Sequence, residues 1–277
     1  MKISVIITIY NEEKHIEKCL SSLKEQSFKN FEVIVIDDGS TDKTREVLAE
    51  FKTKDNNSLK LKILKKDHQG PAKARNLAVT KSKGDILVFL DGDMFFDKDF
   101  LKQLISPIEK GKAKGTFSTE EYVANWNNCW ARAWNYNWNL PDKRRINPQN
   151  INQAKDFRAI LKKEFDKVGG FEDIGYTDTW TLSEKLKYKP QATKAKYYHF
   201  NPSSLKEIFN QSKWVAKRKY KLGGLGKGIA LLRANPIFSL ISGLKTALIK
   251  KEPGFLVFKL VYDFGLSLGL LEKKKHA

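Results

Sequence analysis

Apolar runs and amphipathic segments alternate along the first hundred residues. Continuous runs of β-branched and aromatic residues at 3–9, 31–36 and 86–90 are typical of strands buried on both faces, and a weaker alternation at 59–64 predicts one more strand. Segments with helical spacing of apolar residues lie between them, near 16–23, at 43–51 and at 72–82. This order predicts an α/β fold, Rossmann-like, with a mostly parallel sheet, right-handed crossovers and helices on both faces.

Acidic residues follow three of these strands directly. Glu12 follows the first strand, Asp37 and Asp38 end the second, and Asp91 and Asp93 end the fourth. The carboxyl ends of parallel strands meet at one edge of the sheet, where open α/β folds bind ligands. Clustered carboxylates repel one another unless a cation binds, and hard oxygen ligands suit Mg²⁺ or Mn²⁺ with positions left for phosphate. For any single acid, a surface turn is the alternative interpretation.

Composition adds a strong positive charge to this picture. The 277 residues carry a formal net charge of +19, which indicates an anionic partner: nucleic acid, an acidic membrane or a phosphate-rich ligand. Cys19 and Cys129 are the only cysteines, so neither a disulfide framework nor a cysteine metal site is expected. The chain begins directly with a strand, so no signal peptide is expected and a cytoplasmic location is predicted.

The composition shifts near residue 229. Apolar stretches at 237–248 and 254–271 contain charges and are too interrupted to predict a membrane span. Lys250-Lys251 and Lys273-Lys274-Lys275 border them. Apolar helices with basic borders are typical of segments that lie on an anionic membrane surface, here the inner face of the cell membrane. The alternative is a helical pair that packs on the domain or on a second copy, as in a homodimer.

The last stretch has its own polar side. Lys259 and Asp263, four residues apart, can pair on a narrow polar stripe that Ser267 extends. The remaining large side chains are then predicted to face lipid: Phe255, Phe258, Tyr262, Phe264, Leu266 and Leu270.

Four tryptophans recur every fourth residue within 125–139, at positions 126, 130, 134 and 138. On a helix they form one aromatic stripe. The stripe can be a platform for a sugar ring or an isoprenoid acceptor. We favour the other interpretation, in which it packs under the sheet as core.

Four motifs in the first hundred residues share a family resemblance. They are Ile7-Thr8-Ile9-Tyr10-Asn11-Glu12-Glu13, Val35-Ile36-Asp37-Asp38-Gly39-Ser40-Thr41-Asp42, Gly70-Pro71-Ala72-Lys73-Ala74-Arg75-Asn76 and Asp91-Gly92-Asp93. In this order they resemble the signatures of family 2 glycosyltransferases, which have a GT-A fold and use nucleotide-diphosphate sugars. The resemblance continues more loosely through Phe157-Arg158 and Val168-Gly169-Gly170-Phe171, to about residue 220.

The resemblance implies roles for individual residues. By position, Tyr10, Glu12 and Asp38 would contact the base and ribose of the nucleotide, and Lys73 and Arg75 would lie near it. Asp91 would lie near the ribose and the metal, and Asp93 would ligate the metal directly.

The family's catalytic base follows its Gly-Gly-Phe turn. The resemblance implies that Asp178 is this base, with Thr177 where the family has Glu. Glu172 and Asp173 are rivals that fall earlier in the chain, and the usual downstream Arg is absent near Glu184. The alternative for Asp178 is a helix N-cap and nothing more.

His199 is one further candidate, for the metal or the pyrophosphate. It lies among aromatic residues, where a lone histidine is more often simply packed and hydrogen-bonded. With it, the implied metal set is Asp91, Asp93 and His199, for Mg²⁺ or Mn²⁺.

Together these features predict a metal-dependent, inverting hexosyltransferase. The donor would be a UDP- or GDP-linked sugar, and the acceptor a cell-envelope glycan, a lipid-linked saccharide or a polyprenyl phosphate. Residues 1–110 are expected to bind nucleotide and metal, 111–220 the acceptor, and 221–277 to form a membrane-associating helical appendage.

Other classes fit the sequence less well. A nucleotidyltransferase would need a Gly-rich basic loop after the first strand, which residues 8–13 lack. A nucleic-acid-binding protein fits the charge, but the acidic loops would repel a phosphate backbone. A catalytically weak scaffold remains an alternative because Thr177 replaces the usual Glu.

Overall fold

The computed structural model describes residues 1–55, 58–147, 149 and 156–272. The chain divides into two compact units. Unit 1 comprises Met1–Tyr122, Ile146–Asp173 and Asp178–His199. Unit 2 comprises Val123–Arg145, Ile174–Thr177 and Phe200–Ala277.

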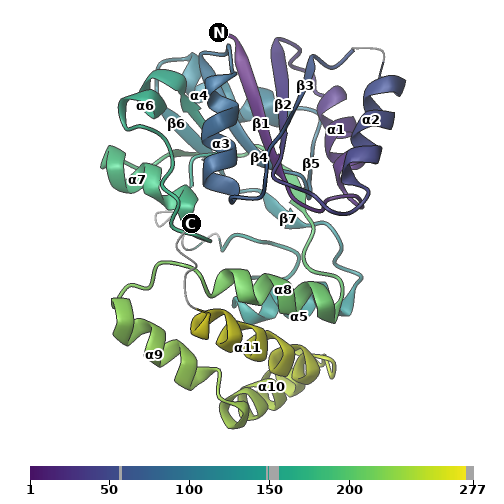
Figure 1. Cartoon of the computed structure of the whole chain (residues 1–277), viewed down its shortest axis with the longest axis vertical. Coiled ribbons are helices and arrows are strands. Elements are labelled where there is room, and N and C mark those ends of the chain that lie inside the picture. Colours follow the sequence, from purple (N-terminus) through teal and green to yellow (C-terminus); the bar gives the residue numbers. More distant parts are fainter. Residues whose placement is uncertain (56–57, 148, 150–155, 273–277) are drawn as a thin grey trace. The chain divides into compact units, whose positions relative to one another are not determined.

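A seven-stranded sheet forms the centre of unit 1, in the order β3-β2-β1-β4-β8-β6-β9 (Figure 1). Its strands are β1 (Ile3–Ile9), β2 (Phe31–Asp37), β3 (Leu61–Lys65), β4 (Ile86–Asp91), β6 (Gly115–Ser118), β8 (Ala159–Leu161) and β9 (Gln191–Thr193). The first four run parallel, with Ile6 of β1 between Ile34 and Phe89, and β8 runs antiparallel to both of its neighbours. The sheet is therefore mostly parallel, as predicted.

A second sheet of three short strands has the order β5-β10-β7. The strands are β5 (Met94–Phe96), β10 (Tyr197–His199) and β7 (Glu121–Val123). Because β10 pairs antiparallel with β5, His199 lies opposite Met94 and thus beside the end of β4.

Helices cover both faces of the large sheet. They are α1 (Ile16–Lys24), α2 (Thr44–Lys54), α3 (Pro71–Thr80), α4 (Phe100–Glu109), α6 (Lys162–Lys167) and α7 (Thr181–Leu186). Val5 and Ile7 point to one side of β1, into a core with α1, α2 and α4. Ile6 points to the other side, into a core with α3, α6 and α7. This alternation confirms the predicted α/β fold with helices on both faces.

Unit 2 is helical. Its helices are α5 (Cys129–Asn137), α8 (Leu205–Val215), α9 (Gly223–Arg233), α10 (Pro236–Lys250) and α11 (Phe255–Leu271). Trp134 of α5 is buried against Phe258 and Tyr262 of α11. The C-terminal helices are thus not a separate appendage, because residues far earlier in the chain complete their core.

The tryptophan stripe is shorter than predicted. Helix α5 begins at Cys129, so Trp126 lies in the preceding turn, and Trp138 follows the helix end. Trp130 and Trp138 are partly buried beside Trp134. The stripe does form core, as favoured, but this core is built with α8 and α11 and not under the sheet.

The predicted orientation of α11 is wrong. Phe255, Phe258, Tyr262 and Leu266 are buried inside unit 2, so they do not face lipid, whereas Phe264 is exposed. Lys259 Nζ does pair with Asp263 Oδ1 at 2.8 Å, but Asp263 is buried and also accepts a hydrogen bond from Ser239 of α10. The predicted polar stripe therefore packs against a neighbouring helix.

Among the described residues, we find no helix with the length and apolar character needed to span a membrane. The predicted basic border at 273–275 lies outside the described residues. The predicted boundaries at 110 and 220 stay predictions, since units 1 and 2 follow contacts and not functions.

Candidate active site

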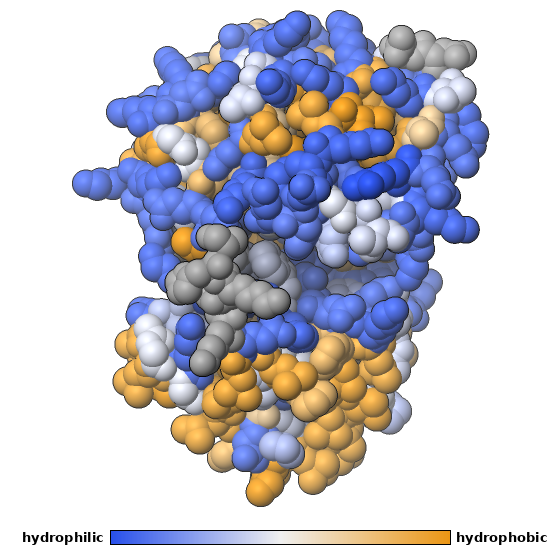
Figure 2. All heavy atoms as spheres, in the orientation of Figure 1, coloured by the Kyte–Doolittle hydropathy of each residue, from blue (hydrophilic) through white to orange (hydrophobic). Residues whose placement is uncertain are grey.

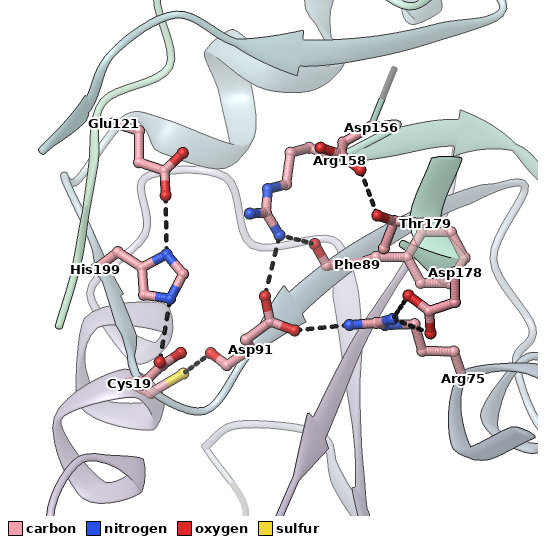
Figure 3. Close-up of polar contacts among 11 residues, drawn as sticks. Cys19, Arg75, Phe89, Asp91, Glu121, Asp156, Arg158, Asp178, Thr179 and His199 are labelled. Carbon is pink, nitrogen blue, oxygen red and sulfur yellow. Dashed lines mark hydrogen bonds and ion pairs between the residues drawn. The ribbon is translucent and has the colours of Figure 1, made fainter. Parts of the chain in front are cut away.

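Asp91 ends β4 between two arginines (Figure 3). Arg75 of α3 donates from Nη2 to Asp91 Oδ1 at 2.9 Å, and Arg158, just before β8, contacts Asp91 Oδ2 at 3.4 Å. Burial alone would raise the pKa of Asp91, but the two guanidinium groups outweigh it and lower the pKa to about 2. Asp91 is therefore a fixed negative charge held between two fixed positive ones.

Arg75 also holds Asp178, the predicted base. Its Nη1 lies 3.0 Å from Asp178 Oδ2 and 3.2 Å from Oδ1. One guanidinium of α3 therefore joins Asp91, at the end of β4, to Asp178, which lies 87 positions later in a short segment before α7. Asp178 is buried, and this burial raises its pKa to about 6 despite the opposing attraction of Arg75. A carboxylate that titrates near 6 is suited to accept a proton at neutral pH.

The alternative role for Asp178, a helix cap, does not describe this geometry. Trp180 is the N-cap residue of α7, and Asp178 lies one turn earlier in a short 3₁₀ segment, Asp178–Trp180. The buried Nε of Arg75 has no hydrogen-bond partner among the described residues, so one donor at this site is available to a ligand.

Asp93 and His199 lie together on the other side of Asp91. His199 Nε2 is 3.1 Å from Asp93 Oδ2. On its other side, His199 Nδ1 is 2.8 Å from Glu121 Oε1 (Figure 3). A carboxylate that binds one ring nitrogen fixes the orientation of a histidine whose other nitrogen points to a site. The sequence made His199 a candidate for the metal or the pyrophosphate. The structure places it beside Asp93, and its contact with a metal stays a prediction.

These donors suit a divalent cation that is shared with a substrate. No group of three or more His, Cys, Asp or Glu side chains is arranged to hold a metal within the described ranges. Asp93 and His199 offer one hard oxygen and one imidazole nitrogen, and Mg²⁺ or Mn²⁺ commonly takes its other positions from phosphate and water. Both oxygens of Asp91, the third predicted ligand, contact arginines.

The second acidic strand end is engaged with its own chain. Asp38 Oδ1 lies 2.6 Å from Lys66 Nζ, and its Oδ2 accepts from the backbone of Gly70 at 2.8 Å. Asp37 ties down the following loop through Ser40 and pairs with Arg45. These contacts connect the ends of β2 and β3 to the start of α3.

The other predicted nucleotide ligands are exposed, in Tyr10 and Lys73, or partly exposed, in Glu12. Tyr10 is exposed and packs its ring 4.2 Å from the ring of His68. The backbone of Glu12 is fixed by the Thr44 hydroxyl at 2.8 Å. Lys73 is half exposed and lies 3.7 Å from Asp173, the rival base. Contacts of these residues with a nucleotide stay predictions.

Arg158 and Glu121 were not predicted from the sequence. Arg158 does lie in the looser part of the resemblance, after Phe157. A single arginine among apolar residues, however, does not indicate a function from sequence alone. Glu121 could not be found from sequence because only the position of β10 beside β7 in the three-stranded sheet brings His199 to it.

Comparisons with known proteins identify the family. The model of the family described as Glycosyl transferase family 2 matches residues 4–169. The poly(ribitol-phosphate) β-N-acetylglucosaminyltransferase TarS of Staphylococcus aureus (strain Mu50) is 39% identical over 112 residues, which cover 40% of this chain and 19% of TarS. Glycosyltransferase AglE of Haloferax volcanii is 32% identical over 176 residues, covering 62% of this chain and 55% of AglE. The chain thus aligns with between a fifth and about half of the length of these relatives.

Solved structures share the fold over nearly the whole chain. TarS of S. aureus in complex with UDP-GlcNAc matches with a TM-score of 0.59 at 20% identity, covering 97% of this chain and 91% of that one. The mannosyltransferase PcManGT of Pyrobaculum calidifontis, in complex with GDP-Man and Mn²⁺, matches with a TM-score of 0.62 at 18% identity, covering 99% and 88%. At these identities the likeness establishes the GT-A fold. Because the family model spans well over half of the sequence and includes every strand from β1 to β4, the chain belongs to glycosyl transferase family 2.

Proposed function

We propose that this protein transfers a sugar, with inversion, from a UDP- or GDP-linked donor to a hydroxyl group of a glycan or polyprenyl-linked acceptor. The observation that carries the proposal is the buried chain of contacts from Asp178 through Arg75 to Asp91. It places a carboxylate with a raised pKa next to fixed positive charge at the carboxyl edge of a GT-A sheet. The relatives and the solved structures named above support a nucleotide-sugar donor.

Asp178 supplies the base in this mechanism. Inverting transfer requires that the acceptor hydroxyl lose its proton as its oxygen attacks the anomeric carbon. An Asp178 carboxylate accepts that proton on Oδ1 or Oδ2 when the pH lies above about 6. Its contact with Arg75 holds it in place and favours its ionised form.

Arg75 and Arg158 supply positive charge for the leaving nucleoside diphosphate. Negative charge grows on the diphosphate as the sugar leaves, and fixed cations in a water-poor site stabilise that charge. The free Nε of Arg75 is one donor for such an oxygen. Asp93 and His199 would hold a divalent cation that neutralises the same charge when bound, with Glu121 orienting His199.

The experiment is a donor screen followed by product analysis. UDP-, GDP- and dTDP-sugars are tested with and without Mn²⁺ for their effect on the melting temperature, because a ligand that binds only the folded state raises it. One donor should raise it in a Mn²⁺-dependent way, and sugar transfer to a lipid-linked or soluble glycan acceptor should follow. If no nucleotide sugar shifts the melting temperature with or without metal, the proposal is wrong. Donor binding with no turnover on either acceptor class would favour the weak-scaffold alternative.

A further inference from the structure

Helix α10 buries small residues and exposes large apolar ones, the reverse of the usual arrangement in water. Its packed face holds small residues at a spacing of four, Ser239, Gly243 and Ala247, and lies against α11. Its outer face holds Ile241, which is 60% exposed, and Leu248, which is 78% exposed. Small residues between helices and large apolar ones outside are typical of helices packed in lipid.

Helix α9 has no buried residue. It contains four glycines in eleven residues, and an isolated helix of this length and composition is unstable in water. Leu225 and Leu232 are each 68% exposed, so its apolar side chains contribute to the same outer surface. The contacts within unit 2 therefore do not account for the stability of this helix.

The exposed apolar residues extend over both α9 and α10. Figure 2 shows apolar side chains gathered over the helices of unit 2. We name as the outer surface the exposed large apolar residues of α9 and α10 with the residue before α9: Leu222, Leu225, Ile229, Leu231, Leu232, Ile237, Phe238, Leu240, Ile241, Leu244, Leu248 and Ile249. Exposed apolar patches of this kind mark interaction sites.

The charges around the outer surface select the partner. Residues 221–251 contain six Lys and Arg residues and no Asp or Glu. All six are exposed: Lys221, Lys227, Arg233, Lys245, Lys250 and Lys251. Apolar side chains with cations and no anions complement an anionic lipid surface, where acyl chains take the former and headgroups the latter. A second copy would bring the same six cations against these, which Coulomb repulsion disfavours.

We propose that the outer surface of α9 and α10 docks the protein onto an anionic lipid bilayer without crossing it. The sequence prediction placed both apolar stretches, 237–248 and 254–271, on the membrane surface. This proposal keeps the first stretch and adds α9, but it leaves out Phe255, Phe258, Tyr262 and Leu266 of α11, which are buried. The inference does not depend on the proposed function, because vesicle binding needs neither donor nor acceptor.

The first test concerns the apolar contact. Full-length protein is floated with vesicles of mixed phosphatidylglycerol and phosphatidylcholine at about 0.1 M salt, where the Debye length is about 10 Å. Leu248→Ser should weaken vesicle binding by about 10-fold or more, because a leucine is no longer transferred out of water. Leu77→Ser, which removes an exposed leucine on α3 of unit 1, is the matched control and should bind as the parent does.

The second test concerns charge. Lys245→Gln, Lys250→Gln and Lys251→Gln together should weaken binding by on the order of 100-fold, since each lysine near an anionic surface is worth about fivefold. The control has the same net charge and replaces Lys102, Lys110 and Lys112, which are exposed around α4 of unit 1. This control should lose far less vesicle affinity than the first triple variant. Pure phosphatidylcholine vesicles should bind the parent weakly.

Three outcomes overturn the proposal. In the first, the parent protein does not bind the mixed vesicles at low salt. In the second, the two triple lysine variants weaken binding equally, so that only net charge matters. In the third outcome, light scattering shows a dimer that Leu248→Ser dissociates, and the outer surface is then a contact between copies. Donor-induced melting shifts, measured on the same variants, separate this result from any failure of the proposed function.

Discussion

Helices α4 and α10 both carry apolar residues at helical spacing. In α4 these residues point into the protein, whereas in α10 they point out of it. In α4, Leu101, Leu104 and Ile105 are buried against the sheet, and Lys102 is exposed to solvent. In α10, Ser239 and Gly243 are buried and the leucines are outside. In unit 1 the apolar face of α4 is therefore buried within the unit. The candidate site residues there are buried charges at the edge of the sheet. Unit 2 leaves its largest apolar area for something else to cover. Under our two proposals, unit 1 carries out the chemistry and unit 2 binds the lipid surface.

The largest effect that can test this division is the loss of the base in unit 1. Asp178→Asn should reduce turnover by about 10²–10⁴-fold, the usual contribution of general base catalysis, with donor affinity near that of the parent. Vesicle binding should not change, because Asp178 lies in unit 1 and the outer surface in unit 2. Steady-state kinetics and flotation measure the two effects on one preparation.

Asp173→Asn is the matched control for that experiment. Asp173 is half exposed and lies 3.7 Å from Lys73, so its charge is largely screened. Full activity of Asp178→Asn together with an inactive Asp173→Asn would move the base to the earlier residue.

The next effect concerns the Asp93–His199 pair. Asp93→Asn should weaken Mn²⁺-dependent donor binding by about 100-fold or more, because a neutral amide is a poor ligand for a hard cation. Glu121→Gln should cost a smaller factor, about 10–100-fold, through the orientation of His199. Calorimetry with and without Mn²⁺ separates the two. Donor affinity that is unchanged in both variants would place the metal elsewhere.

A stability change in unit 2 comes third. Asp263→Ala leaves Lys259 and Ser239 without their partner between α10 and α11, and should lower the free energy of unfolding by about 3 kcal/mol. Donor binding at temperatures below the transition should be retained. Asp99→Ala, an acid in unit 1 that bonds the exposed Ser27, is the control and should change stability much less. Loss of donor binding in folded Asp263→Ala would show that the two units are not functionally separate.

The smallest effect is a pH dependence of stability at Asp178. Its folded pKa of about 6 exceeds the ordinary value of 3.8, so the folded protein binds the proton more tightly than the unfolded chain does. The protonated form thus contributes stability at low pH, and this contribution is lost as the pH rises through about 6. Between pH 4 and pH 8 the parent should therefore lose about 2 kcal/mol of stability relative to Asp178→Asn, which lacks this titrating group. Chemical denaturation of both proteins at both pH values provides the measurement, and a stability difference between them that does not change with pH would contradict it.

Much of unit 1 could be predicted because each strand is short, continuous and apolar. The run at 3–9 is bounded by Lys2 and Tyr10, so pattern alone gives its ends as the structure has them. The candidate site could be predicted for a related reason, since parallel strands bring Asp91 and Asp93 to one edge with Asp38. The partners of these acids were not all predictable. Arg158 contacts Asp91 because β8 pairs antiparallel with β4, and no local pattern encodes that pairing.

Unit 2 was predicted less well for a physical reason. Helix α10 has two stripes, one of small residues and one of large apolar ones, and composition does not say which of them faces the protein. The same holds for α11, where the lysine–aspartate stripe indicates a wet surface but in fact packs against Ser239. Which face of a helix is covered depends on neighbours far away in sequence, such as Trp134.

Arg75 has a consequence for how such chains vary in evolution. Its planar guanidinium contacts Asp178 with one nitrogen and Asp91 with another, which the single ammonium group of a lysine cannot reproduce. A chain that loses either carboxylate leaves a buried cation with less than its full charge balance. Positions 75, 91 and 178 should therefore covary, so that a homologue with a neutral residue at 178 also lacks arginine at 75. Substitution of only one of the three would mark a lineage that has given up catalysis while keeping the fold.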